Sequence, residues 1–97
     1  MVTLEDFRES LAGAKPAANL SVPLQASWWA GKDDWDTAHK LVMGESSTDA
    51  AWVHAYLHRV EGDLANARYW YAQAGKSPAT NAIKDEWAEM AAMLLRG

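Results

Sequence analysis

The chain has 97 residues, of which 49% are hydrophobic and 23% charged, and this composition predicts a single folded domain over residues 1–97. Its formal net charge is -4. Because phosphate contacts dominate the affinity for nucleic acids, an acidic chain with scattered Lys and Arg residues is not expected to bind DNA or RNA. The lack of cysteine excludes disulfides, thiolate zinc sites and a cysteine nucleophile.

No segment of the sequence indicates secretion or membrane insertion. The opening residues MVTLEDFRES are acidic where a signal peptide would be basic and then apolar. Charged residues interrupt every apolar stretch well before the roughly 20 residues that a membrane span requires. We therefore expect a cytoplasmic protein without a membrane partner.

The apolar residues recur at intervals of three and four, and Gly, Pro, Ser and Asp separate the apolar runs. This pattern predicts an all-α chain of about six helices. The first two expected helices are about 3–12 and 23–30. The third is capped by Asp33 or Asp34 and runs to 43, and the fourth is about 49–60 and is capped by Ser47 or Thr48. The fifth is capped by Asp63 and runs to 74, and the sixth is about 80–95.

Two segments of similar plan follow each other at an offset of 29 residues: KDDWDTAHKLV (32–42) and EGDLANARYWY (61–71). The aligned pairs are Asp34 with Asp63, Trp35 with Leu64, Ala38 with Ala67, Val42 with Tyr71, Ala26 with Ala55 and Trp28 with Leu57. An antiparallel helix pair cannot bury its apolar face alone, so a second pair must cover it. We therefore predict two stacked helix–turn–helix units at about 23–43 and 49–75, flanked by helices at about 3–12 and 80–95.

The expected fourth helix is apolar around more than half of its circumference, through Ala50, Trp52, Val53, Tyr56, Leu57 and Val60. A helix this apolar is expected to lie between neighbours. The residues expected to face inward on the next helix are Leu64, Ala67, Trp70, Tyr71 and Ala74. The apolar stripe of the last helix comprises Ile83, Trp87, Met90, Ala91 and Leu94.

The second unit resembles a tetratricopeptide repeat, whose motif order is matched by Trp52, Ala55, Gly62-Asp63, Ala67, Tyr71, Ala74 and Pro78. The block HAYLHR-x-EGD-x-x-NA-x-YWY also resembles a group of small uncharacterised microbial proteins, and that likeness covers about residues 33–75. The first resemblance implies a short right-handed solenoid of antiparallel helix pairs, a scaffold that often holds peptides. The second implies a shared fold and assigns no activity.

Two histidines lie four residues apart in the expected fourth helix, where His54 and His58 share one face and Glu61 follows one turn later. Neutral imidazoles at this spacing can bind one divalent metal such as Zn²⁺, and His39 could approach from the preceding helix as a third ligand. The residues between the two histidines are AYL, so the general-base glutamate of the metalloprotease motif is missing. We favour structural histidines, hydrogen-bonded at the flank of a buried helix; a metal-dependent activity at this site is the second hypothesis.

A second candidate site combines arginines with aromatic residues: Trp52, Arg59, Arg68 and Tyr69. A guanidinium beside aromatic rings suits a carboxylate-bearing or peptide ligand, because it pairs with anions and stacks on rings. The alternative is intramolecular, with Arg59 covering tryptophan faces and Arg68 paired with Glu61 or Asp63.

The sequence has no Ser-His-Asp signature, glycine-rich phosphate loop or nucleotide-binding motif, which makes an enzyme the less favoured class. The predicted function is a non-catalytic helical-repeat binding or adaptor module that recognises a peptide or a small anionic ligand and needs no cofactor. Its partner would be a protein or peptide. The last helix could also form a homodimer through Met90, Met93, Leu94 and Leu95, if its apolar area is left uncovered.

Overall fold

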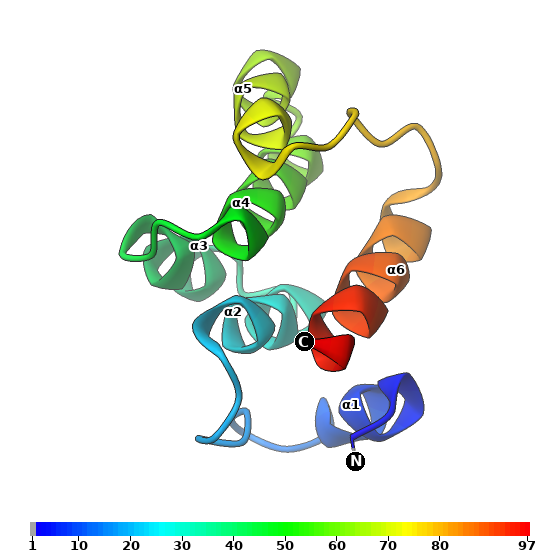
Figure 1. Ribbon diagram of the computed structural model, residues 1–97. Helices are drawn as coiled ribbons and strands as arrows, with labels where there is room; N and C mark the ends of the chain where they lie inside the picture. Colours follow the sequence, from blue (N-terminus) through cyan, green and yellow to red (C-terminus); the bar gives the residue numbers. More distant parts are fainter. Residues whose placement is uncertain (1) are drawn as a thin grey trace.

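The computed structural model describes residues 2–97, and over this range the chain forms six helices and no strand (Figure 1). The helices are α1 (Leu4–Ser10), α2 (Val22–Gly31), α3 (Trp35–Met43), α4 (Thr48–Glu61), α5 (Leu64–Ala74) and α6 (Ile83–Arg96). The predicted all-α class and the predicted number of helices are confirmed. Within residues 2–97, no helix has the length and apolar character needed to cross a membrane.

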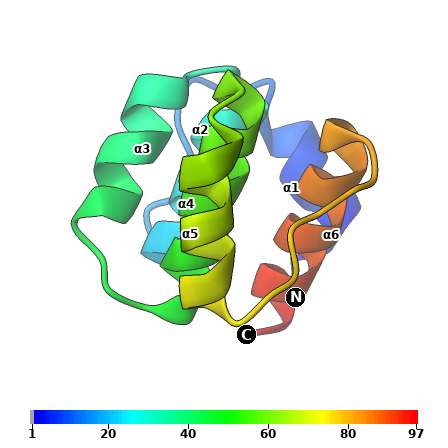
Figure 2. The ribbon, with the colours of Figure 1, turned by 90° about the horizontal axis from the view of Figure 1, so that it is seen from above.

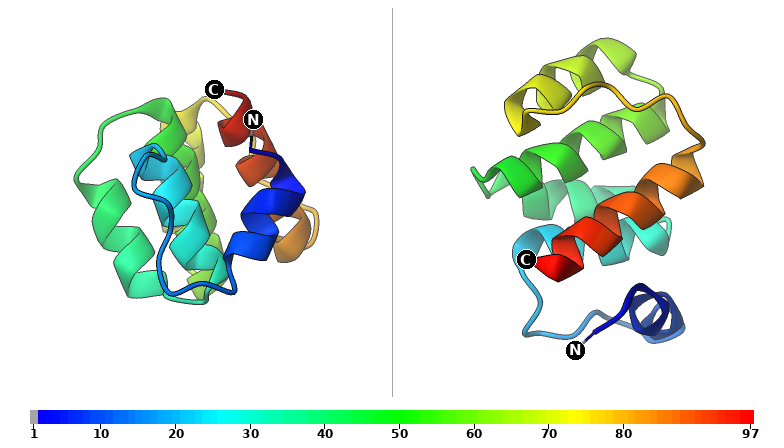
Figure 3. Two further views of the ribbon diagram at one scale, coloured as in Figure 1. Left: turned by 90° about the horizontal axis from the view of Figure 1, so that it is seen from below. Right: turned by 45° about the vertical axis from the view of Figure 1, so that its right-hand side comes forward.

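Helices α2 to α5 pack in chain order, each against the next, and α6 then turns back toward the start of this stack (Figures 1 and 2). Helix α6 packs against α2 and α4, and α1 packs against α6. Phe7 of α1 stacks on Trp87 of α6, with ring centroids 5.9 Å apart, and the left-hand panel of Figure 3 shows the two helices next to each other. The two flanking helices therefore lie together in space, although they stand at opposite ends of the sequence. The right-handed solenoid stays a prediction.

Helix α4 is the central helix, because it packs against α2, α3, α5 and α6. Every residue from Ala50 to His58 is buried, as the apolar circumference of this segment predicts. Val60 and Leu64, which the sequence assigns to the buried faces, are exposed instead. Both flank the turn between α4 and α5, where a residue at a helix end has fewer neighbours than one in the middle of the helix.

Most positions aligned by the 29-residue repeat have equivalent structural roles. Four aligned pairs inside the helices are 2% exposed or less: Ala26 with Ala55, Trp28 with Leu57, Ala38 with Ala67, and Val42 with Tyr71. The pair Trp35 with Leu64 differs, since Trp35 is half-buried and Leu64 is 57% exposed. Asp34 and Asp63 are both N-caps, each accepting a hydrogen bond from the backbone N–H three residues later at 3.2 Å. The capping role predicted for Asp33 or Asp34 thus falls to Asp34, and the repeat is a repeat of structure.

The turn before each of these caps is also shared. Asp33 has φ +62° and Gly62, its equivalent 29 positions later, has φ +89°. In both turns the next backbone N–H donates to a carbonyl five residues earlier, from Asp34 to Trp29 at 2.9 Å and from Asp63 to His58 at 3.0 Å. The left-handed conformation costs glycine little, and Asp tolerates it better than most residues.

The sixth helix begins at Ile83, three residues after the expected start near Thr80. Residues 75–82 instead form the connection that carries the chain from the end of α5 back to α6 (Figure 1). The Arg59 guanidinium donates to the Asn81 backbone carbonyl and so ties this connection to α4. Ile83, which the apolar stripe includes, is exposed as a consequence of its place at the start of the helix.

We expect Gly62→Ala to lower the free energy of unfolding by roughly 1–2 kcal/mol, because a Cβ raises the cost of the left-handed conformation. An added Cβ at this position would meet no atom within 4 Å, so the loss reports backbone strain alone. The matched variant Gly62→Asn should lose less, since Asn enters the left-handed region more readily. Equal losses in urea unfolding for the two variants would contradict this account of the turn.

Candidate functional site

All three histidines of the chain come together between α3 and α4. His39 lies on α3, and His54 and His58 lie one turn apart on α4. One ring nitrogen from each residue lies within 4.8 Å of the others, and the two Nε2 atoms of His39 and His54 are 3.1 Å apart. We call these three residues the histidine cluster. The structure thus places His39 where the metal hypothesis requires a third imidazole.

Two tryptophan rings hold the imidazoles of the histidine cluster in place. Trp35 stacks on His39, with ring centroids 4.5 Å apart, and its Nε1 donates to the Leu57 carbonyl at 2.7 Å. Trp70 stacks on His54 at 3.9 Å with an angle of 12° between the ring planes. These contacts restrict rotation of the imidazoles about their side-chain bonds, so the cluster is ordered by its surroundings.

The outer end of the histidine cluster carries a carboxylate. His58 Nδ1 lies 2.6 Å from Glu61 Oε1, and the two residues are three positions apart on α4. A neutral imidazole that donates from Nδ1 presents Nε2 as a lone-pair acceptor. The same carboxylate–histidine pairing orients ligands in many metal sites. Glu61 is therefore placed to orient His58, and it also belongs, with His58 and Asp63, to a second group of possible ligand atoms that lie within 4.8 Å of one another.

Burial and mutual repulsion favour the neutral forms of His39 and His54, two members of the histidine cluster, by lowering their pKa values. Desolvation lowers the pKa of His54 to about 4, and the neighbouring His39 and His58 add to this shift. Burial also lowers the pKa of His39, with a smaller contribution from His58, while Glu61 and Asp36 act in the opposite direction. Neutral imidazole is the form that binds metals, so His54 and His39 need lose no proton near pH 7 to serve as ligands.

We expect the metal-free protein to lose stability as the pH falls from about 6.5 toward 4, the interval between the ordinary and the lowered pKa of His54. In this interval the unfolded chain binds a proton that folded His54 does not, so acidification favours unfolding by roughly 1–2 kcal/mol at pH 5. Urea unfolding in EDTA at pH 7.5 and pH 5 measures the difference in the free energy of unfolding between the two pH values. This difference should be smaller in His54→Gln than in the unaltered chain. An unchanged pH dependence in that variant would refute the assignment to His54.

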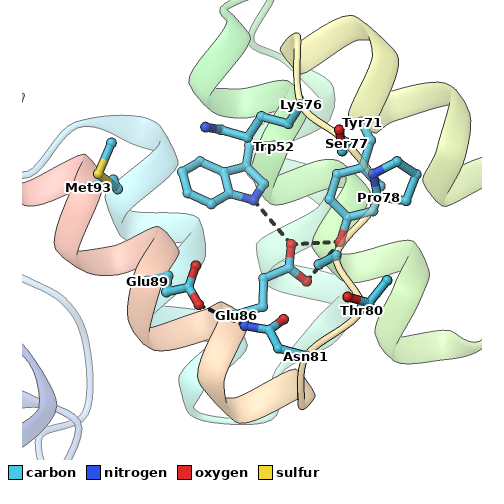
Figure 4. A pocket seen from close by; sticks show the side chains of 11 residues that line it. Trp52, Tyr71, Lys76, Ser77, Pro78, Thr80, Asn81, Glu86, Glu89 and Met93 are labelled. Atoms are coloured by element: carbon cyan, nitrogen blue, oxygen red, sulfur yellow. Dashed lines mark hydrogen bonds between the residues drawn. The ribbon is translucent and has the colours of Figure 1, made fainter.

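A second polar cluster lies on the α6 side of α4, around the buried carboxylate of Glu86, which is 2% exposed. Tyr71 Oη donates to this carboxylate, at 2.6 Å from Oε2, and Trp52 Nε1 donates to Oε2 at 3.2 Å (Figure 4). Arg59 Nη1 donates to Oε1 at 2.8 Å and forms an ion pair with it. We call these four residues the Glu86 network. It ties α4, α5 and α6 together.

Burial and the charge of Glu86 also raise the pKa values of two tyrosines, Tyr71 inside the Glu86 network and Tyr56 outside it. Burial, followed by the hydrogen bond and charge of Glu86, raises the pKa of Tyr71 well above its usual value. Burial, with the Glu86 charge second, raises the pKa of Tyr56 to about 12. Both phenols therefore stay protonated at neutral pH, and Tyr71 is available as a donor to the carboxylate.

Comparison of the chain with models of known protein families, with curated proteins and with solved structures found no match. Function must therefore be argued from the two clusters themselves.

The four residues of the predicted anion-binding groove lie in two places. Trp52 and Arg59 both bond to Glu86. Arg68 and Tyr69 are exposed on α5, where Tyr69 packs edge-on against Trp70 at 5.1 Å. Within residues 2–97, Arg68 forms no ion pair. The structure does not join the two pairs through a shared hydrogen bond, ion pair or ring contact.

The apolar face of α6 is largely used inside the protein. Of the residues named for a homodimer contact, Met90 and Leu94 are buried and Leu95 is half-buried, whereas Met93 is 48% exposed. Contacts with α1, α2 and α4 account for this coverage. A dimer through α6 would thus have Met93 as its main apolar contact.

Glu86 is the functional residue that sequence reasoning missed. It lies four residues before Met90 and one before Trp87, inside the apolar stripe of α6. A carboxylate within such a stripe is a signal, since a buried charge requires a partner. The partners themselves could not be read from the sequence, because Arg59 is 27 positions away and Trp52 is 34.

We expect Glu86→Ala to lower the free energy of unfolding by about 3–5 kcal/mol, because it leaves the Arg59 cation without its counter-charge. Glu86→Gln keeps a hydrogen-bond acceptor and should cost less, roughly 1–3 kcal/mol. Glu89→Ala, at an exposed position on the same helix, is the matched control. Urea unfolding in which Glu86→Ala and Glu89→Ala lose the same stability would contradict a structural role for the Glu86 network.

Proposed function

We propose that this protein is a small metal-binding helical module, in which His39, His54 and His58 bind one divalent transition-metal ion of the zinc class. The observation that carries the proposal is the convergence of three imidazoles from two helices, with one nitrogen of each within 4.8 Å of the others. The chain has no other histidine and no cysteine, so all of its nitrogen ligands of this type are gathered at one point.

The spacing of the nitrogens agrees with that of a metal site. Two ligands of a tetrahedral zinc ion, each about 2.0 Å from the metal, are about 3.3 Å apart. The Nε2 atoms of His39 and His54 are already 3.1 Å apart. Without a metal, these two nitrogens share one hydrogen bond, with one ring donating and the other accepting. To bind an ion through both Nε2 atoms, the donating ring would carry its proton on Nδ1 instead.

Supporting residues give the histidine cluster the second layer of contacts that metal sites require. Glu61 bonds Nδ1 of His58 and so leaves Nε2 for the ion. Trp35 and Trp70 cover ring faces of His39 and His54 and keep the surroundings apolar. Apolar surroundings of this kind strengthen the attraction between the ion and its ligands.

Three protein ligands leave one position of a tetrahedral ion for water or for a ligand from outside. A water molecule at that position would be acidified by the ion, which is the basis of the alternative, metal-dependent activity.

The peptide- or anion-binding adaptor function stays a prediction, with Arg68 and Tyr69 as the groove residues that remain accessible.

The test is isothermal titration with Zn²⁺ of protein that carries no affinity tag and has been treated with EDTA. We expect one ion per chain, and a loss of at least about tenfold in affinity for each of His39→Gln, His54→Gln and His58→Gln. Glu61→Gln should weaken binding by about tenfold or more while keeping the 1:1 ratio. Asp49→Asn, at an exposed position on the same helix, should change nothing.

Co²⁺ provides an independent readout, because its absorption spectrum distinguishes tetrahedral from octahedral coordination. A tetrahedral spectrum that disappears in His54→Gln would support the proposal. The proposal would be overturned if the unaltered chain did not bind zinc. It would also be overturned if the three histidine variants bound zinc as tightly as the unaltered chain does.

A further inference from the structure

A cavity of about 590 Å³ lies between α4, the loop after α5, and α6, on the far side of the Glu86 network from the protein core (Figure 4). Its volume falls within the range of small-molecule sites. The residues that matter for its chemistry are Trp52 from α4, Lys76 and Asn81 from the loop, and Glu86 and Glu89 from α6. It is separate from the histidine cluster and shares no lining residue with it.

A cation already occupies an aromatic surface in this cavity. The Lys76 Nζ lies 4.1 Å from the centroid of the Trp52 ring, within the range of a cation–π contact. Lys76 is exposed and belongs to the loop between α5 and α6 rather than to a helix. Its side chain can therefore leave the ring without disturbing the packing of the helices.

The other polar groups of the cavity call for hydrogen-bond donors. Asn81 Nδ2 donates to Glu89 Oε1 at 2.7 Å, and this bond fixes the amide orientation because a carboxylate can only accept. Asn81 Oδ1 consequently points away from Glu89, and among residues 2–97 it is a buried acceptor with no donor. Because this oxygen is buried, the exposed Glu89 carboxylate is the acceptor of this pair that a ligand can reach, and it favours a ligand that supplies N–H groups.

Lys76 is the one cation among the described residues that line the cavity, and it lies over the Trp52 ring, while the neighbouring cation Arg59 is already paired. The Arg59 guanidinium donates to Glu86 and to the Asn81 backbone carbonyl. If Lys76 moves away, the negative charge of Glu89 remains, and no cation of the described residues forms an ion pair with it. The cavity is then an aromatic face next to a carboxylate, which is the combination that binds organic ammonium groups.

We propose that this cavity binds a primary alkylammonium group, which takes the place of the Lys76 ammonium on the Trp52 ring and is attracted to the cavity by Glu89, an exposed carboxylate of the same lining. The side chain of Lys76 is itself an unbranched alkylammonium, so its position over the Trp52 ring shows that such a group fits there. The same chemistry is offered by small diamines and by a lysine side chain of a peptide. Lys76 acts as a tethered competitor, so ligand affinity depends on how readily it is displaced.

The test follows the indole N–H resonance of Trp52 by NMR, in full-length protein with EDTA present so that amines do not act through a bound metal. The resonance is assigned from its loss in Trp52→Phe. The probes are 1,5-diaminopentane for the small-molecule source and Nα-acetyl-lysine amide for the peptide source. Pentan-1-ol is the neutral control and acetate the anionic control.

We expect both amines to shift the Trp52 signal in a saturable manner, and Lys76→Met to tighten their binding by about two- to fivefold. Glu89→Gln should weaken binding by about two- to fivefold. Lys84→Met, which removes another exposed lysine, is the matched control and should leave binding unchanged. Binding of only one amine identifies the source and supports the proposal equally.

Three results would overturn the amine site. One is a Trp52 signal in Lys76→Met that neither amine shifts at tens of millimolar. Another is a shift by pentan-1-ol or acetate at least as strong as that by the amines. The third is an amine affinity that stays the same in Glu89→Gln. Because Lys76 and Glu89 are exposed, their variants are expected to fold, and Lys76→Ala provides a second removal of the competitor.

Discussion

The burial of α4 on all sides is the constraint from which both polar clusters follow. Helices α2, α3, α5 and α6 surround it, so every polar side chain in its buried part must find a partner inside the protein. Leaving such a group unpaired costs on the order of 1–3 kcal/mol, and more for a charge. The polar side chains of α4 find partners on two sides. His54 and His58 are directed to α3. Trp52 and Arg59 are directed to Glu86 of α6.

The two clusters meet the same constraint with different electrostatics. The histidine cluster contains three bases, and burial lowers the pKa values of two of them so that they remain neutral. The Glu86 network instead pairs a full negative charge with a full positive charge and completes the carboxylate with two further donors. The first arrangement leaves lone pairs available for an ion. The second uses up its charges, so it holds helices together and forms one wall of a cavity.

The sequence predicted the convergence of the three histidines better than that of the four residues of the anion-binding groove. Spacing alone places His54 and His58 on one helical face, and the order of the helices brings α3 beside α4. Nothing in the spacing shows that Arg59 is paired with a glutamate 27 positions later. That pairing exists because α6 turns back onto α4, and the turn depends on the course of residues 75–82, whose sequence permits many paths.

The sequence by itself determined the helices, their caps and the repeated turns. These are local features, since the hydrogen bonds that the Asp34 and Asp63 side chains accept, and the left-handed turns before them, involve residues only a few positions apart. It also determined that the segment from Ala50 to His58 must be covered, because no face of it is polar enough for water. Only the tertiary structure decided which helix covers which face. That choice depends on many weak contacts summed over the whole molecule, and it made neighbours of His39 and His54, of Arg59 and Glu86, and of Lys76 and Trp52.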